Sequence, residues 1–285
     1  MHWQTGFALK ADSIFVVEGD AMRKMMRYED NLKYWDRRWS EAECDADSFE
    51  NLDIYPIKYA EMVVGNNNGR VAEFGCGLGR VVKHYHARGV EITGIERSEI
   101  AVQKIKEESS DLKVLVGDVS KLSFPDGYFD TILAFGLYHN IEDGMVDAIK
   151  ETLRCLKGSG GFCVSIRPDN LEMRLNEWYW NFKARKKYGK SRPGYFHKWA
   201  VKEDEFRAIL KDLGCKIEKV FYARNVSILW RVPFLRKYRN LKNVSEKELR
   251  SCGYQLNTVG ELLDRLLRLA PRSFSNVMVF IGKKL

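Results

Sequence analysis

The feature that most constrains this chain is a glycine-rich turn that follows a short apolar segment. Residues 71–80 read VAEFGCGLGR, so Gly75, Gly77 and Gly79 occupy alternate positions. Glycine lacks a Cβ, which lets the backbone approach a ligand closely and adopt a positive φ. A buried strand, this turn and a following helix together predict a site for a nucleotide-like ligand. A merely tight strand-to-helix turn is the alternative.

The spacing of the glycines separates two kinds of cofactor. A dinucleotide site has the pattern G-x-G-x-x-G and holds a pyrophosphate at a helix N-terminus. Here the pattern is G-x-G-x-G, and Glu73 lies two residues before the first glycine. A carboxylate at that place would repel a diphosphate. It would suit a ligand with an ammonium group, such as the amino acid moiety of S-adenosylmethionine.

Two more acidic residues follow the next predicted strands. Glu96 ends the apolar segment 90–95, at the place where a carboxylate accepts hydrogen bonds from ribose hydroxyls. Asp118 follows the segment 112–116, where a carboxylate can accept from the exocyclic amine of adenine. Either acid alone could be a solvated residue at a strand end. Their placement at successive strand ends favours an adenosyl ligand.

Apolar and β-branched runs predict strands at 69–74, 90–95, 112–116, 129–135 and 161–166, with a closing strand at 276–282. Polar segments with helical periodicity separate the first five runs. One helix is expected to begin at Arg80, a second to be capped by Ser98, and a third to span 143–156. This order predicts a parallel sheet with helices on both faces.

From about residue 30 to about residue 222, the chain resembles the class I S-adenosylmethionine-dependent methyltransferases, with a core like that of types 11 and 25. The resemblance rests on the glycine motif, on Glu96, on Gly117-Asp118-Val119, and on the segments 122–130, 131–140 and 153–162. It implies a Rossmann-like, doubly wound α/β fold with helical lid insertions. The sheet would have seven mostly parallel strands, with the C-terminal strand antiparallel. It also implies S-adenosylmethionine as cofactor, no metal, and a cofactor-binding set consisting of Glu73, Gly75, Cys76, Gly77, Gly79, Glu96, Arg97, Asp118, Val119 and Phe135.

The 285 residues are enough for one such core plus elaborations. We expect an N-terminal helical cap at 1–50 and the cofactor-binding core at 51–168. An aromatic and basic lid insertion would follow at 169–200. Residues 201–285 would complete the sheet and carry a helical insertion at 225–275.

Charge is distributed unevenly along the chain. Residues 1–168 hold 21 Lys and Arg against 27 Asp and Glu, whereas residues 169–285 hold 26 against 12. In the lid, basic residues alternate with aromatic ones, a mixture that suits an anionic or stacking substrate. The alternative is a helix with a solvent-exposed basic face and an aromatic face packed on the core, which would have the same composition. The resemblance favours a lid, with substrate-binding residues at Tyr34, Trp35, Tyr138, Trp178 and Tyr195.

The insertion at 225–275 permits two interpretations. Val259, Leu262, Leu263, Leu266, Leu267 and Ala270 share one helical face, which is expected to pack on the core. The mixture of apolar and basic residues at 228–239 could instead contact an anionic membrane surface peripherally.

A sulfonium methyl group is already electrophilic, so such an enzyme mainly aligns the reactants and removes a proton where needed. His139 follows the fourth predicted strand and is a candidate general base. A hydrogen bond to a loop backbone is an equally good interpretation of this histidine. Tyr138 is better explained by packing than by catalysis.

The exit of the fourth strand has neither an Asn/Asp-Pro-Pro-aromatic motif nor a cysteine, which disfavours base methylation of nucleic acids. We therefore expect methylation, at oxygen, of a small-molecule, glycan or lipid-linked acceptor. The alternatives are an RNA (tRNA) or protein methyltransferase that uses the basic lid, and a non-catalytic partner subunit. The six cysteines show no zinc-type spacing. Residues 1–10 lack a signal peptide's apolar centre, so the expected location is the cytoplasm or the periphery of a membrane.

Overall fold

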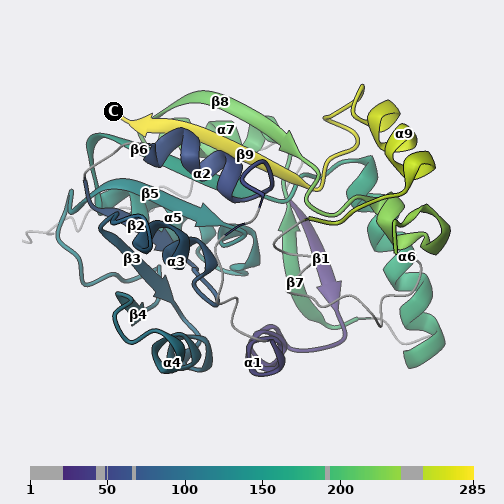
Figure 1. The fold of residues 1–285 in the computed structure, drawn as a ribbon, viewed down its shortest axis with the longest axis horizontal. Helices are drawn as coiled ribbons and strands as arrows, with labels where there is room; N and C mark the ends of the chain where they lie inside the picture. Colours follow the sequence, from purple (N-terminus) through teal and green to yellow (C-terminus); the bar gives the residue numbers. More distant parts are fainter. Residues whose placement is uncertain (1–21, 43–48, 50, 66–68, 190–192, 239–252) are drawn as a thin grey trace, which may run out of the picture.

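A computed structural model describes residues 22–42, 49, 51–65, 69–189, 193–238 and 253–285 (Figure 1). The expectation about residues 1–10, and parts of the predicted cap, lid and C-terminal insertion, lie outside the described residues. Among the described residues, no helix is both long and apolar enough to cross a membrane.

The central sheet has seven strands, as predicted. In spatial order they are β4 (Val114–Val116), β3 (Ile92–Glu96), β2 (Val71–Phe74), β5 (Phe129–Phe135), β6 (Leu156–Ile166), β9 (Val277–Lys284) and β8 (Cys215–Ala223). The first five are parallel, and β9 is antiparallel to both of its neighbours. The Rossmann-like fold with an antiparallel C-terminal strand is therefore confirmed. The chain leaves β2 toward β3 and later returns to β5, so the switch point lies between β2 and β5.

Helices cover both faces of this sheet (Figure 1). One face carries α2 (Ile57–Val64), α3 (Arg80–His86) and α4 (Glu99–Glu108), and the other carries α5 (Met145–Arg154) and α7 (Glu203–Asp212). Strand β5 contributes side chains to the hydrophobic core on each face of the sheet. Leu133 packs against the first group of helices, and Ile132 and Ala134 pack on the opposite face. The predicted helix starts hold, since α3 begins at Arg80 and the Ser98 side chain caps α4.

The N-terminal part of the chain contains a strand as well as the expected helix. Strand β1 (Arg23–Arg27) pairs antiparallel with β7 (Tyr195–Ala200), and α1 (Asn31–Glu41) follows it. The lid segment is helix α6 (Leu171–Tyr188) followed by β7. Figure 1 shows the two-stranded sheet beside the main sheet, with α1 and α6 flanking it. The cap and the lid are thus joined by backbone hydrogen bonds.

The expectation that the apolar face of the C-terminal insertion packs on the core is wrong. In helix α9 (Thr258–Leu267), Val259, Leu262 and Leu266 are 59%, 59% and 55% exposed. The residues that α9 buries are Gly260 and Asp264. Asp264 is buried and pairs with Arg224, whereas the apolar stripe is largely exposed. Two short 3-10 turns, η2 (Ile228–Arg231) and η3 (Pro233–Leu235), precede α9.

Candidate active site

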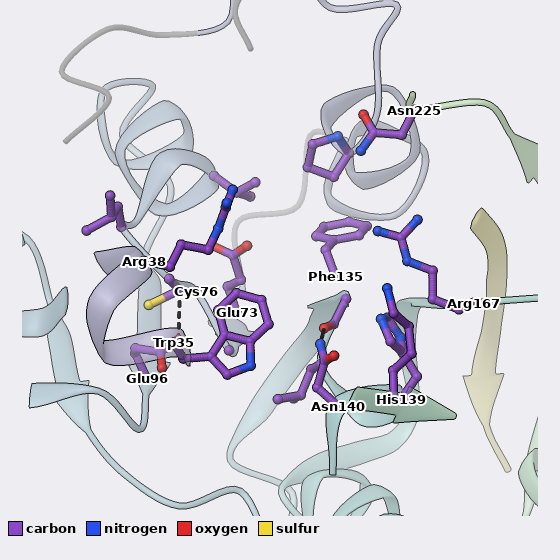
Figure 2. Close-up of a pocket in the computed structure, with 18 of the residues that line it drawn as sticks. Trp35, Arg38, Glu73, Cys76, Glu96, Phe135, His139, Asn140, Arg167 and Asn225 are labelled. Carbon is purple, nitrogen blue, oxygen red and sulfur yellow. Dashed lines mark hydrogen bonds between the residues drawn. The ribbon is translucent and has the colours of Figure 1, made fainter. Parts of the chain in front are cut away.

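A cavity of about 1160 Å³ lies at the carboxyl ends of the parallel strands, where open α/β sheets bind ligands. Figure 2 shows Glu73, Cys76 and Glu96 on one side of it, and Phe135, His139 and Arg167 on the other. The cavity is larger than most single-ligand pockets, which rarely exceed about 1000 Å³. It therefore has room for a cofactor and a second molecule.

Gly75 and Gly77 of the glycine turn line this cavity and form a glycine wall, whereas Gly79 is the N-cap of α3 and does not line it. Gly75, Gly77 and Gly79 all have positive φ, at +70°, +57° and +73°. A Cβ on Gly77 would lie 2.9 Å from a ring carbon of Trp39 in α1, and one on Gly75 would lie 2.9 Å from Cδ1 of Leu137. Side chains at these two positions would be strained and would collide with their neighbours.

Glu73 is the unusual residue of the cofactor side. It lies in β2, its side chain is buried, and one carboxylate oxygen, Oε2, has no hydrogen-bond partner among the described residues. Burial raises the pKa of Glu73 to about 8, although the charge of Arg80 acts in the opposite direction. A buried carboxylate oxygen without a donor, beside a glycine wall, fits the ammonium group of S-adenosylmethionine.

Glu96 and Asp118 are held in place by neighbouring backbone amides. Glu96 accepts from the Gly77 amide at 2.9 Å and from the Ser98 amide at 3.0 Å. Asp118 accepts from the amide and the hydroxyl of Ser120, at 2.9 and 2.7 Å. A carboxylate has about four acceptor sites, so both groups keep capacity for a ligand. Arg97, Val119 and Phe135 also line the cavity, and their contact with a cofactor stays a prediction.

His139 lies on the opposite wall, in the 3-10 turn η1 (Tyr138–Asn140) after β5. Its side chain is buried, and its Nδ1 has no partner in the described part of the chain. Burial lowers the pKa of His139 well below its usual value, and the charges of Arg167, Lys198 and His197 lower it further. The ring is therefore neutral at physiological pH and can accept a proton.

Two of the five predicted substrate residues, Tyr34 and Trp35, line the cavity. Tyr138 does not, because its ring is buried in the core and its hydroxyl shares a hydrogen bond of 2.7 Å with Thr152. Trp178 and Tyr195 do not line it either, and they are 67% and 51% exposed. Trp178 instead stacks on Phe182 along the outer surface of α6.

Several residues that line the cavity were missed by the sequence analysis: Arg27, Trp39, Tyr55, Arg167, His197 and Lys198. Arg167 directly follows β6, so the rule that ligands bind at strand ends would have found it. Arg27 and Lys198 belong to β1 and β7, and no sequence motif marks those strands.

Comparison with known proteins agrees with this geometry. Residues 72–164 match the methyltransferase domain family. An uncharacterized methyltransferase of Staphylococcus carnosus is 25% identical over 138 residues, which span 47% of this chain and 65% of the relative.

Two solved structures have a similar fold. One is an S-adenosylmethionine-dependent methyltransferase of Archaeoglobus fulgidus, which is 19% identical with a TM-score of 0.51 over 80% of this chain and 89% of that one. The other, from Methanosarcina mazei, is 16% identical with a TM-score of 0.53 over 82% of this chain and 99% of that one. Residues 72–164 therefore match a methyltransferase domain, within a fold that is shared with S-adenosylmethionine-dependent methyltransferases.

Proposed function

We propose that the chain is an S-adenosylmethionine-dependent methyltransferase that acts on a small-molecule, glycan or lipid-linked acceptor, with transfer to oxygen. The observation that carries this proposal is the buried carboxylate oxygen of Glu73 beside the glycine wall, which has no hydrogen-bond partner among the residues that the structure describes. It lies in a cavity large enough for a second molecule. The cytoplasm, or the periphery of a membrane through residues 228–239, is the proposed location.

The cofactor would supply an electrophilic methyl group. Glu73 would hold its ammonium group, Glu96 its ribose hydroxyls and Asp118 its adenine amine. The glycine wall would let the ligand lie against the backbone. The ring of Phe135 would separate the cofactor side from the acceptor side, and the main contribution of the protein would be alignment in a site with little water.

His139 would accept the proton of an acceptor hydroxyl. Its ring is neutral and its Nδ1 lacks a partner among the described residues, so it is free to take a proton. The depressed pKa makes it a weak base, which suffices only because the sulfonium methyl is strongly electrophilic. A cavity at the strand ends favours a small acceptor over RNA or protein.

Glu96→Ala is expected to weaken S-adenosylmethionine binding more than about tenfold, because the variant removes both acceptors for the ribose diol. Isothermal titration calorimetry would measure the loss. Glu99→Ala, at an exposed position in the first turn of α4, is the control. An unchanged affinity in Glu96→Ala would remove Glu96 from the site.

His139→Ala is expected to lower turnover about tenfold. This loss is smaller than the usual rate contribution of a general base, because His139 is a weak base. Methyl transfer would be followed from tritium-labelled S-adenosylmethionine to fractionated cell extract, and the labelled product would identify the acceptor. Cofactor affinity should stay unchanged in this variant. Full activity would exclude the base role, and the absence of any labelled product with the wild type would favour a non-catalytic subunit.

A further inference from the structure

The acceptor side of the cavity carries three basic side chains from three separate elements. Arg27 ends β1, Arg167 follows β6, and Lys198 lies in β7. All three line the same cavity as His139, and we call them the cationic cluster. Figure 2 shows Arg167 near His139, on the side of Phe135 away from Glu73.

Arg27 is held rigidly but keeps free hydrogen-bonding capacity. Its guanidinium lies over the ring of Tyr34, 3.7 Å from the ring centroid, and one terminal nitrogen contacts Nδ1 of His197. The other terminal nitrogen, Nη1, is buried and has no partner in the described structure. A planar guanidinium that is fixed in this way is preorganised to bind an anion.

Arg167 is also short of partners. Arg167 donates from Nη1 to the carbonyl oxygen of Asn276 at 2.6 Å, while its buried Nε has no acceptor among the described residues. Burial lowers the pKa of both Arg167 and Lys198, and the pKa of Lys198 falls well below its usual value with a further contribution from the charges of Arg167 and Arg27. The cations therefore repel one another inside a partly desolvated space.

The nearby acids are engaged elsewhere. Glu142 pairs with Lys24 at 2.6 Å, Glu177 pairs with Arg23, and Asp30 caps α1. Within the described ranges, no carboxylate lies within ion-pair distance of Arg27, Arg167 or Lys198. By contrast Arg224, which also lines the cavity, pairs with both Glu172 and Asp264. Uncompensated charge away from water is costly, so a bound ligand is the remaining source of negative charge.

We propose that the acceptor carries a carboxylate or phosphate group, which the cationic cluster binds next to the site of methyl transfer. This inference rests on the proposed function and deepens it. The forked donors of two arginines match the oxygens of either group, and Lys198 adds a point charge. Because the cluster lies within a cavity, the terminal anion of a small molecule fits better than the backbone of a nucleic acid. A bound anion would also offset the charges that weaken His139 as a base.

Calorimetry on protein saturated with S-adenosylhomocysteine tests this proposal. Inorganic phosphate and benzoate are the anionic probes, and benzamide is the neutral analogue of benzoate. At least one anion should bind saturably, and the one that binds identifies the acceptor group. Lys198→Met and Arg167→Met should each weaken that binding at least about tenfold. Lys216→Met removes the same charge from an exposed position on β8, away from the cavity, and should leave binding unchanged.

Two readouts distinguish this proposal from a failure of the proposed function and from a purely structural role of Lys198. Affinity for S-adenosylhomocysteine is measured first, so a failure there counts against the proposed function and not against the cluster alone. Lys198→Met should also raise the midpoint of thermal unfolding, because it removes a repelled, partly buried charge. A merely structural lysine would not combine a stability gain with a loss of anion binding. The proposal is overturned if neither anion binds to the loaded wild type, if benzamide binds as tightly as benzoate, or if Lys198→Met binds anions normally.

Discussion

Replacing Glu73 by glutamine is expected to weaken binding of S-adenosylhomocysteine about 100-fold, or roughly 3 kcal/mol. The reason is that Glu73 supplies a buried carboxylate oxygen without a partner in the described part of the chain, and an amide of the same shape cannot form an ion pair with an ammonium group. Titration calorimetry on the purified variant measures the change. Glu91→Gln, at an exposed position before β3, removes the same charge and should bind normally.

The raised pKa of Glu73 predicts that ligand binding is coupled to the release of a proton. With a pKa of about 8, Glu73 is mostly protonated in the ligand-free protein at about pH 7, and it must ionise to pair with the ammonium group. Binding should therefore release close to one proton and tighten between about pH 6 and about pH 7.5. Calorimetry in buffers with different ionisation enthalpies counts this proton. Glu73→Gln should lose the release along with the affinity.

As the pH rises, the stability of the ligand-free protein should change in the opposite direction to its affinity for the cofactor. The folded protein holds the pKa of Glu73 above its usual value, so this group destabilises the fold increasingly as pH rises from about 4.5 to about 8. Glu73→Gln abolishes that effect, so the ligand-free variant should unfold at a higher temperature than the wild type near pH 8 and at a similar one near pH 4.5. A variant that bound normally, or that lost stability at pH 8, would contradict the role of Glu73.

The sequence was sufficient for the parts of the site that depend on local patterns. Three glycines with positive φ, a carboxylate two residues before them and acids after the next strands lie within about 50 residues, and each depends on its own strand end. Apolar runs located the strands because parallel strands are buried on both faces. The start of α3 and the Ser98 cap of α4 follow from equally local chemistry.

The acceptor side depends on contacts between distant segments, which no local pattern records. Arg27 and Lys198 come together because β1 pairs with β7, across roughly 170 residues of chain. Composition indicated a basic and aromatic segment, and the family resemblance placed Trp178 and Tyr195, but not Lys198, in the site. In the structure Trp178 on α6 and Tyr195 on β7 are both exposed, whereas Lys198, also on β7, lines the cavity.

Helix α9 shows a different limit of sequence analysis. Its apolar stripe is regular, and such a stripe normally marks the buried face. Here the opposite side of the helix is held by Asp264, whose partner Arg224 lies at the end of β8. The buried side of α9 carries this ion pair and the close approach of Gly260 to the Leu235 carbonyl, and hydrophobic periodicity gives no information about either contact.

Arg224→Met is accordingly expected to destabilise the protein by about 3–5 kcal/mol, the usual loss when one partner of a buried ion pair is removed. Arg224 is 2% exposed. It donates to Glu172 and Asp264 at 2.6 Å each and to the Ser227 hydroxyl at 2.7 Å. The variant leaves the buried Glu172 without its counter-ion and leaves Asp264 with only the exposed Arg268. Denaturant unfolding followed by circular dichroism measures the loss.

Arg268→Met is the matched control. Arg268 donates to the same Asp264 at 2.7 Å, but its side chain is 56% exposed, so its removal should change stability by less than about 1 kcal/mol.

The Arg224→Met loss should also depend on pH. Burial already raises the pKa of Glu172 although Arg224 lowers it, so removing Arg224 raises that pKa further. A higher pKa of Glu172 in the folded state costs stability that grows as the pH rises above its usual value, so the variant should lose more stability at about pH 8 than at about pH 5. Adding Glu172→Gln to Arg224→Met should recover part of the loss at pH 8. Equal losses in Arg224→Met and Arg268→Met, or a loss independent of pH, would show that apolar packing rather than this ion pair holds α9 and α6 to the core.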